Sequence, residues 1–178
     1  MALTAQQVQQ FYIGYYGRPA DPVGLAYWQT QDEATALKGF SESAEFTNQF
    51  TGLSASQQVT KVYNNLLGRA PDTAGLLYWA GELTAGRETI GTLVLSMTKN
   101  ALGKDVTTIE DRVTYSNAFT TALNTAEEIN AYAGTAATQA ARDALLKVVA
   151  TAVGDHTALN AETAKIDATI ATIVSGGS

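Results

Sequence analysis

The sequence predicts an all-α protein built on an internal duplication, and three observations lead to this prediction. The 17-residue stretch Tyr12–Trp28 recurs as Tyr63–Trp79, with a constant offset of 51 residues and no gap. Apolar residues recur at helical spacing along much of the chain. Short stretches rich in Gly, Pro and Asp separate these helical segments. We therefore expect a duplicated three-helix unit that forms a compact helical domain, with a C-terminal Ala/Thr-rich helical extension.

The first helix of each copy has one apolar face. Its members stand at positions i, i+3, i+4 and i+7: Val8, Phe11, Tyr12 and Tyr15 in copy one, and Val59, Val62, Tyr63 and Leu66 in copy two. Capping boxes are predicted where Thr4 precedes Gln7 and where Ser54 precedes Gln57. Each helix should end in a left-handed glycine, and these glycines are Gly17 and Gly68.

The turn that follows should start the second helix in both copies. Asp21 and Asp72 are predicted N-caps. Pro22 takes the first helical position, where a backbone N–H group would have no partner within the helix, so its absence costs nothing. Gly24 and Gly75 lie three residues inside the helix, where glycine costs about 1 kcal/mol relative to alanine. Because both copies keep this glycine, we expect another backbone segment to pass close to it.

Trp28 and Trp79 end the repeated stretch and are expected in the core, each with a leucine three residues earlier. In copy one we expect helices at about 4–16, 22–36 and 40–50, and in copy two at 54–67, 73–84 and 87–99. The C-terminal helices are expected at 108–123, 126–132 and 138–153, followed by a last helix capped by Asp155. The predicted division is therefore a repeat domain at 1–103 (copy one about 4–50, copy two about 54–100), a C-terminal part at 104–174 packed on it, and a linker at 175–178.

Composition excludes several classes of protein. The net charge is −6 and 46% of residues are hydrophobic, which is typical of a globular chain. An acidic protein lacks the Lys/Arg stripes of nucleic-acid binding, and no apolar run approaches the roughly 18 residues of a membrane-spanning helix. The chain has no cysteine, so it forms no disulfide. No basic residue precedes Arg18, so the N-terminus does not have the pattern of a secretory signal peptide.

No catalytic constellation is evident, and the sequence predicts a protein that is not an enzyme. The single histidine, His156, has no visible partner and is expected at the surface. A hydrolase acting on surface polysaccharide is the enzymatic alternative, and it would need two carboxylates facing a cleft. The candidate pairs, Glu42 with Glu45 and Glu127 with Glu128, have an exposed pattern.

A calcium site at the repeated aspartates is the less favoured interpretation. Calcium takes roughly six to eight oxygen ligands, and each turn offers one carboxylate. We therefore predict no metal or cofactor in this chain.

The repeated arginines have two open interpretations. Arg18 and Arg69 follow the helix-ending glycines, where each can cap carbonyl groups or pair with the aspartate three residues on. The alternative is that they bind an anionic or sugar ligand. Copy one is rich in tyrosine, whose hydroxyl groups and ring faces suit sugars. The candidate ligand-binding residues are accordingly Arg18, Tyr15, Tyr16, Tyr27 and Arg69.

The repeated Leu-Gly-Arg-x-Pro-Asp-x-x-Gly-Leu-x-Tyr-Trp pattern resembles a helical repeat domain of unknown function found in secreted bacterial proteins. More narrowly, the chain resembles the N-terminal cell-anchoring domains of surface-layer (S-layer) proteins of Gram-negative bacteria. Copy one departs from the pattern, because it has Pro19-Ala20-Asp21 where copy two has Ala70-Pro71-Asp72.

The resemblance implies a secreted protein at the bacterial cell surface. It implies type I export without an N-terminal signal peptide, binding to lipopolysaccharide O-antigen, and contact with other copies in a lattice. Calcium would enter only through the rest of the parent protein. The alternatives are a protein–protein interaction or structural module of a type I-secreted adhesin or calcium-repeat protein, and a cytoplasmic helical adaptor.

Overall fold

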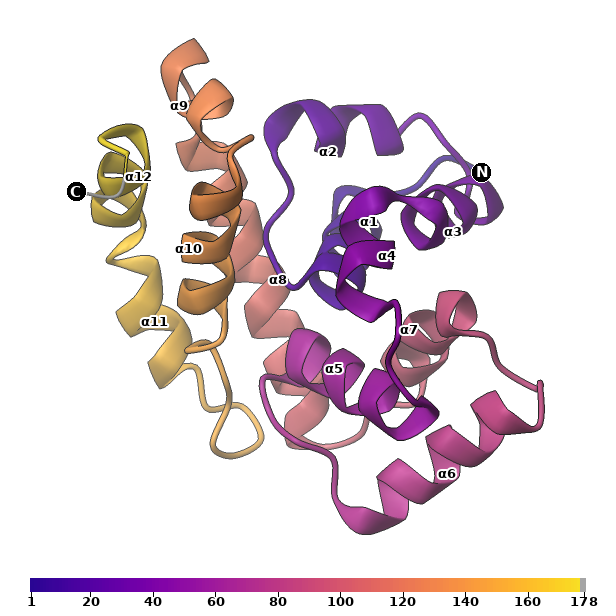
Figure 1. The fold of residues 1–178 in the computed structure, drawn as a ribbon. Helices are drawn as coiled ribbons and strands as arrows, with labels where there is room; N and C mark the ends of the chain where they lie inside the picture. Colours follow the sequence, from indigo (N-terminus) through magenta and orange to yellow (C-terminus); the bar gives the residue numbers. More distant parts are fainter. Residues whose placement is uncertain (177–178) are drawn as a thin grey trace.

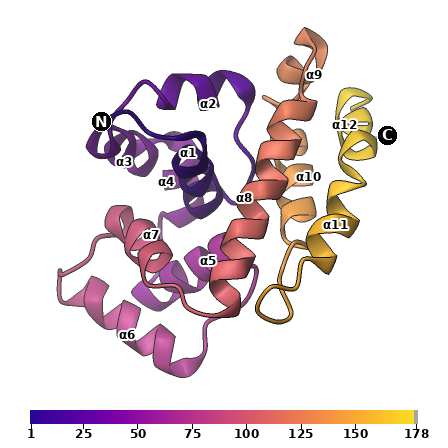
Figure 2. The ribbon, with the colours of Figure 1, turned by 180° about the vertical axis from the view of Figure 1, so that it is seen from behind.

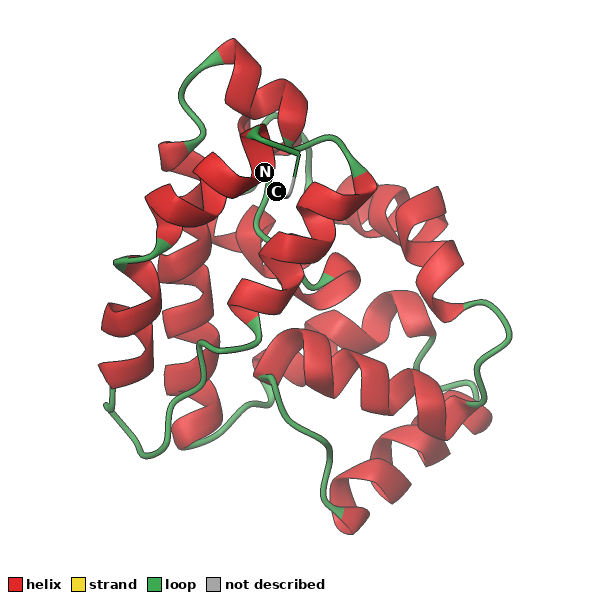
Figure 3. Ribbon diagram, turned by 60° about the vertical axis from the view of Figure 1, so that its left-hand side comes forward, coloured by secondary structure: helices red, strands yellow, loops and turns green. Residues whose placement is uncertain are grey.

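The computed structural model describes residues 1–176 and confirms the all-α prediction. This range contains twelve α-helices, one π-helix and no strand (Figure 3). Among its helices, none is both long and apolar enough to cross a membrane. The linker predicted at 175–178 lies partly outside the described residues, which end at Gly176.

Helices follow one another through short turns. In copy one they are α1 (Ala5–Phe11), the π-helix η1 (Tyr12–Tyr16), α2 (Pro22–Trp28), α3 (Glu33–Glu42) and α4 (Ala44–Phe50). The next three are α5 (Ala55–Leu67), α6 (Thr73–Thr84) and α7 (Ile90–Lys99). The remaining helices are α8 (Lys104–Ala122), α9 (Ala126–Ala131), α10 (Thr135–Leu145), α11 (Thr157–Thr163) and α12 (Ile166–Val174). Both predicted capping boxes are present.

Four predicted helices were wrong in extent. The helix expected at 40–50 starts at Ala44, because Ser43 ends α3 and caps α4 by accepting from the Phe46 N–H at 3.3 Å. The helix expected at 22–36 ends at Trp28, because the chain turns through Gln31 and Asp32 then caps α3 by accepting from the Thr35 N–H at 2.8 Å. The helix expected at 138–153 ends at Leu145. The expected last helix is two helices, α11 and α12, although Asp155 accepts from the Thr157 N–H at 3.0 Å near the predicted start.

The two copies pack on each other through equivalent elements. The π-helix η1 contacts α5. Helix α3 contacts α7, which lies below it in the view of Figure 1. At the centre of this arrangement Asn65 donates from Nδ2 to the carbonyl oxygen of Gly14, its own equivalent 51 residues earlier, at 3.3 Å. The repeat therefore assembles with an approximate two-fold relation.

Helix α8 lies between the two halves of the molecule (Figure 2). It contacts α1 and α5 on one side and α10, α11 and α12 on the other. Its buried polar side chains serve neighbouring loops: Thr108 Oγ1 accepts from the Ala150 N–H at 3.0 Å, and Thr120 Oγ1 donates to the carbonyl of Ala20. Gln9 closes a ring by donating to Thr120 at 2.8 Å and accepting from the Ala20 N–H at 3.0 Å. These bonds satisfy backbone groups that burial would otherwise leave unpaired.

Candidate functional site

The repeated turn has the predicted local geometry. Gly17 and Gly68 have φ values of 75° and 66°, the left-handed conformation that ends a helix. Asp21 accepts from the Gly24 N–H at 2.9 Å, and Asp72 accepts from the Gly75 N–H at 3.0 Å. The N-cap interpretation of both aspartates is confirmed, and Pro22 occupies the first turn of α2.

The reason for the helix-interior glycines differs from the prediction. A Cβ on Gly24 would lie 2.0 Å from the Tyr12 hydroxyl oxygen, and one on Gly75 would lie 2.5 Å from that of Tyr63. The close neighbour is therefore a tyrosine hydroxyl in each copy, and the expected passing backbone was wrong. Each tyrosine lies on the helix before its glycine, twelve residues earlier (24 − 12 and 75 − 63), so the contact joins the two helices of the motif.

Arg18 and Arg69 make matching structural contacts. Arg18 binds Glu45 with two hydrogen bonds of 2.7 and 2.8 Å, and Arg69 binds Asp105 with two of 3.2 and 2.8 Å. Each guanidinium also donates to the carbonyl of the next residue, at 3.0 Å. The partner carboxylates lie in the first turns of α4 and α8, so neither arginine pairs with the aspartate three residues on.

Each arginine also covers a tyrosine ring. The Arg18 guanidinium carbon lies 5.2 Å from the Tyr12 ring centroid, and that of Arg69 lies 5.2 Å from the Tyr63 centroid. Arg18 is 8% exposed. The Glu45 hydrogen bonds hold the pKa of Arg18 above its usual value despite desolvation. The structural interpretation of both arginines is therefore supported, with different partners from those expected.

Tyr15 and Tyr16 are not on the surface, which corrects the expected recognition face of copy one. Tyr15 is fully buried and its hydroxyl donates to the carbonyl of Gly91, while Tyr16 is 7% exposed and donates to Ser43 Oγ at 2.8 Å. Tyr27 is 51% exposed on α2, apart from both. The structure thus does not gather the five candidate ligand-binding residues into one site.

Both tryptophans contribute to the core to different degrees. Trp79 is 9% exposed, whereas Trp28 is partly buried and packs on the core. The Trp28 ring lies 5.0 Å from that of Phe40, and a Cβ on Gly39 would lie 2.3 Å from Trp28 Cη2. Gly39 therefore makes room for Trp28.

His156 has a partner, contrary to the expectation. It is half exposed, and its Nδ1 lies 2.7 Å from Oδ1 of the buried Asp111. This pair joins the start of α11 to α8. Within residues 1–176 no group of three or more His, Asp or Glu side chains could hold a metal ion.

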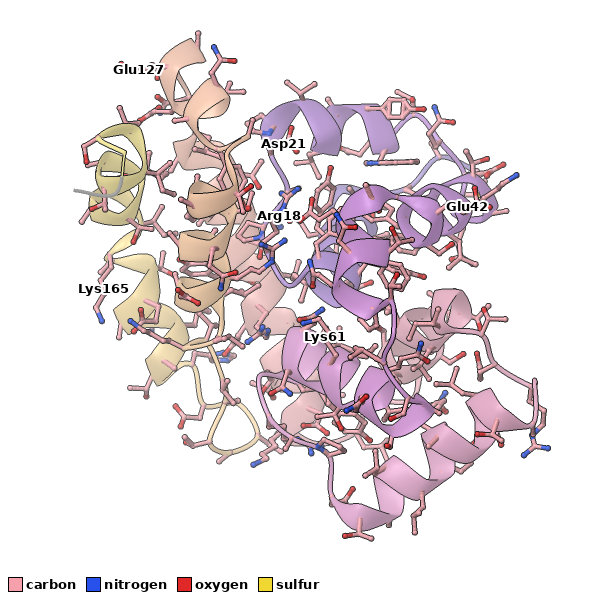
Figure 4. All side chains as sticks on the ribbon, in the orientation of Figure 1. Arg18, Asp21, Glu42, Lys61, Glu127 and Lys165 are labelled. Carbon is pink, nitrogen blue, oxygen red and sulfur yellow. The ribbon has the colours of Figure 1, made fainter. Side chains whose placement is uncertain are left out.

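A cleft with many polar side chains lies between the repeat and the C-terminal helices. It consists of two adjoining hollows that share Gln49 and Arg142. The α5 hollow, of about 660 Å³, lies between α5 and α10, and the α9 hollow, of about 650 Å³, lies between α4 and the connection of α9 to α10. Figure 4 shows Arg18 and Lys61 along this boundary.

Uncharged polar side chains are the most numerous kind in the lining of the cleft, beside apolar and charged ones. Its amide and hydroxyl groups come from Asn48, Gln49, Ser56, Gln57, Thr60, Asn64, Asn65, Asn130, Thr135, Thr138 and Gln139. Gln49 and Asn64 donate from their amide nitrogens to backbone carbonyls, at 3.5 and 3.0 Å. Within residues 1–176 their amide oxygens accept no hydrogen bond, which leaves two acceptors for a ligand.

One carboxylate holds two arginines at the junction of the hollows. Glu45 binds Arg142 Nη2 as well as Arg18, and Arg142 Nε donates to the carbonyl of Tyr16 at 2.7 Å. Desolvation lowers the pKa of Arg142, with the Glu45 charge opposing it. The cluster ties α4, η1 and α10 together at the junction of the two hollows.

Sequence reasoning missed this cleft because its walls come from two pairs of helices, α4 with α5 and α9 with α10, that lie far apart in the chain. The only sequence signal was the run of amides and hydroxyls on the solvent side of α5, at Ser56, Gln57, Thr60 and Asn64. Such a run is also typical of any solvated helix face.

Comparisons with known proteins inform only part of the chain. No curated protein and no solved structure matches it. One family model matches residues 37–101, a segment that runs from within α3 to just past the end of α7. This segment contains the second copy of the motif with its Gly68, Arg69 and Asp72. Residues 37–101 match the family described as a domain of unknown function (DUF4214), and the chain accordingly contains a DUF4214 domain.

Proposed function

We propose that the chain is a non-catalytic anchoring domain of a bacterial surface-layer protein that binds lipopolysaccharide O-antigen at the outer membrane surface. The observation that carries this proposal is the polar cleft between the repeat and the C-terminal helices. Saccharides present many hydroxyl groups, and the amide and hydroxyl lining offers donors and acceptors to match them. The size of each hollow falls in the usual range for small-molecule sites.

Apolar side chains at the same place support a sugar ligand. Leu53, Leu76 and Leu146 line the α5 hollow, and Leu146 is 45% exposed. Sugar rings have C–H faces that pack on apolar groups while their hydroxyls hydrogen-bond around them. An apolar floor with convergent polar groups is the general pattern of ligand pockets.

The cleft changes which residues we assign to binding. Gln49, Asn64 and Arg142 replace the tyrosines of copy one as the groups that contact the saccharide. Arg18 keeps a place at the α9 hollow, where it positions Glu45. Arg69 is held by Asp105 at the far end of α5 and contributes to stability.

The carboxylates support a non-catalytic role. Glu45 is held by two arginines, and Glu128 accepts from the Asn124 and Thr125 N–H groups at 3.0 Å each. Glu42 and Glu127 point outward from α3 and α9 (Figure 4). A glycosidase needs two carboxylates facing one bond across a cleft.

The setting of this domain is part of the proposal. We propose export by a type I route that reads a C-terminal signal, with calcium entering through other parts of the parent protein. Lattice formation would bring copies of the parent protein together at the cell surface. Cell fractionation and the C-terminal sequence of the parent protein test this setting.

A contact module of a secreted adhesin is the second candidate, and the exposed face of α6 favours it. Leu77 and Tyr78 are 69% and 59% exposed, and nothing lies within 4 Å of a Cβ built on Gly81. An exposed apolar helix face of this kind can pack against another protein.

A pull-down with smooth and rough lipopolysaccharide, with and without calcium, tests the proposed function. We expect binding to smooth lipopolysaccharide only, because rough forms lack the O-antigen. The double variant Gln49→Ala/Asn64→Ala should lose binding at an unchanged melting temperature. The control Gln6→Ala/Asn160→Ala removes the same chemical groups from exposed positions outside the cleft and should bind normally. Equal capture of rough and smooth forms would refute O-antigen binding.

A further inference from the structure

The α5 hollow has an unusual charge for this chain. Its lining contains Lys61 and Arg142 and no carboxylate, although the chain has 17 acidic and 11 basic residues. Over both hollows, the three cations Arg18, Lys61 and Arg142 face the two carboxylates Asp21 and Glu45. The cleft is therefore positive by about one charge at neutral pH, and this charge lies in the α5 hollow, which no carboxylate lines.

Lys61 is the uncompensated charge of this group. It is partly buried, and within residues 1–176 it forms no ion pair or hydrogen bond. Its Nζ lies 6.0 Å from the Phe50 ring centroid, a weak cation–π contact. Burial lowers the pKa of Lys61, and the charge of Arg142 lowers it further. A bound anion would offset both effects.

We propose that the α5 hollow binds an acidic sugar unit, with the ligand carboxylate between the Lys61 ammonium group and the Arg142 guanidinium group. The inference rests on the proposed function and assigns a chemical class to the saccharide. The two terminal nitrogens of Arg142 each carry two N–H groups and use one of them, on Thr138 and Glu45, so one N–H on each remains for a ligand carboxylate. Lys61 adds a point charge on a flexible stem.

The rest of the hollow identifies the ligand as a sugar acid and not a small inorganic anion. A volume of about 660 Å³ far exceeds that of a single ion. Gln57, Asn64 and Gln139 surround the two cations with groups that match ring hydroxyls, and Leu146 offers an apolar surface to a ring face. Only a ligand with a charge, hydroxyls and a C–H face would use all of these groups.

Salt should affect this interaction in a specific way. The net charge of −6 repels an anionic polymer at long range, while the cations of the hollow attract it at contact distance. Added salt therefore screens two opposing interactions. We expect the affinity to depend on ionic strength less steeply than for a basic protein.

Calorimetric titration of the whole chain with two oligosaccharides of equal length tests the inference. One is an oligogalacturonate, which carries carboxylates, and the other is a neutral oligoglucan. We expect the wild type to bind the oligogalacturonate at least tenfold more tightly. Lys61→Gln should weaken that binding by about tenfold, because a hydrogen bond to a charged group contributes about 1.5–3 kcal/mol and 1.4 kcal/mol is tenfold.

Two further variants test whether the loss of affinity in Lys61→Gln comes from the charge at this position. Lys38→Gln removes the same charge from an exposed position on α3 and should bind like the wild type. Lys61→Arg keeps the charge and should retain most of the affinity, so a loss in Lys61→Gln cannot be attributed to misfolding.

The outcomes separate the inference from the proposed function. Equal binding of both oligosaccharides, or oligogalacturonate binding unchanged by Lys61→Gln, overturns the acidic-sugar inference and leaves O-antigen binding standing if smooth lipopolysaccharide is still captured. Failure to bind both oligosaccharides and smooth lipopolysaccharide overturns both proposals.

Discussion

The hydroxyl oxygen of Tyr12 occupies the space beside Gly24 where a side chain would begin, only 2.0 Å from a Cβ built there. Tyr63 and Gly75 repeat this relationship at 2.5 Å. With the arginines stacked on the same tyrosines, the repeated motif is a self-contained packing unit. Its recurrence in the two copies therefore follows from folding.

Gly24→Ala should destabilise the protein. The added methyl group displaces the Tyr12 hydroxyl, and overpacking of this kind costs about 1–3 kcal/mol. Gly81→Ala is the matched control, because it is also inside a helix but has open space around it. It should stabilise by about 0.4–1 kcal/mol. Urea denaturation of both variants measures the difference, and equal effects would contradict the packing role of Gly24.

Tyr12→Phe in the Gly24→Ala background tests whether the clash with the Tyr12 hydroxyl causes this loss of stability. Removing the hydroxyl frees the space that the new methyl group needs, so the double variant should recover part of the lost stability. A double-mutant cycle gives the coupling between the two positions. Additive free energies would show that the two groups do not compete for space.

Glu45→Gln should destabilise more than Asp105→Asn, although both break an arginine pair of the same geometry. Removing the Glu45 charge leaves Arg18 and Arg142 without a counter-charge at side-chain exposures of 10% and 18%. The expected cost is about 3 kcal/mol, the low end for breaking a buried pair, because Glu45 keeps some contact with water. The Arg69–Asp105 pair is more exposed, at 32% and 21%, and should contribute less than about 1 kcal/mol. Thermal unfolding of the two variants would contradict this ranking if Asp105→Asn were the less stable.

Buried tyrosines should make the protein unstable at alkaline pH. Burial raises the pKa of Tyr115 to about 12, with the Glu162 charge adding to the shift. An unfolded tyrosine ionises near pH 10, so the unfolded chain loses its proton first and stability falls as pH rises from 10 to 12. Tyr115 alone should cost about 1 kcal/mol between pH 10 and 11.

Tyr115→Phe should remove this share of the pH dependence. At pH 8 the variant should unfold near the wild-type denaturant concentration, and at pH 11 it should be the more stable protein. Tyr78→Phe, at an exposed position, serves as the control. Parallel stability curves for wild type and Tyr115→Phe from pH 8 to pH 11 would contradict the burial effect.

The sequence was sufficient for features encoded within a few residues. The duplication, both capping boxes, the left-handed Gly17 and Gly68 and the two aspartate N-caps all depend on local chemistry. The α10 boundary was mispredicted for a tertiary reason. The apolar period continues through Val148, but the helix stops at Leu145 because the carbonyls of both residues bind Arg112 on α8.

The candidate site depended on relationships that one sequence does not contain. The tyrosine-rich composition around Tyr15 and Tyr16 does not tell whether these side chains face solvent or the core. In the structure their hydroxyl groups donate to partners on α7 and at the start of α4. Arg142 and Lys61 lie on different helices, α10 and α5, and line one hollow because both helices pack on α8. Side chains of this kind are assigned to a site once tertiary packing is known.

Arg112 should be essential to the shape of the cleft. It is fully buried and donates to Leu145 O at 2.8 Å and Val148 O at 3.3 Å, while a second nitrogen donates to Asn65 O at 2.8 Å. These carbonyls end α10 and α5, the two walls of the α5 hollow. Within the described chain no carboxylate pairs with Arg112, and desolvation lowers its pKa. Its binding partners are thus the negative ends of two helices.

Arg112→Met should therefore loosen both walls. The change removes the three hydrogen bonds that the guanidinium donates to buried carbonyls, and each hydrogen bond to a charged group contributes about 1.5–3 kcal/mol, so a loss of about 3 kcal/mol or more is expected. Amide hydrogen exchange should accelerate at the ends of α5 and α10 before it does so elsewhere. Arg87→Met removes an exposed arginine paired with Glu82 and should change neither quantity. Uniform exchange across all helices in Arg112→Met would show that the residue supports the whole fold and not the cleft in particular.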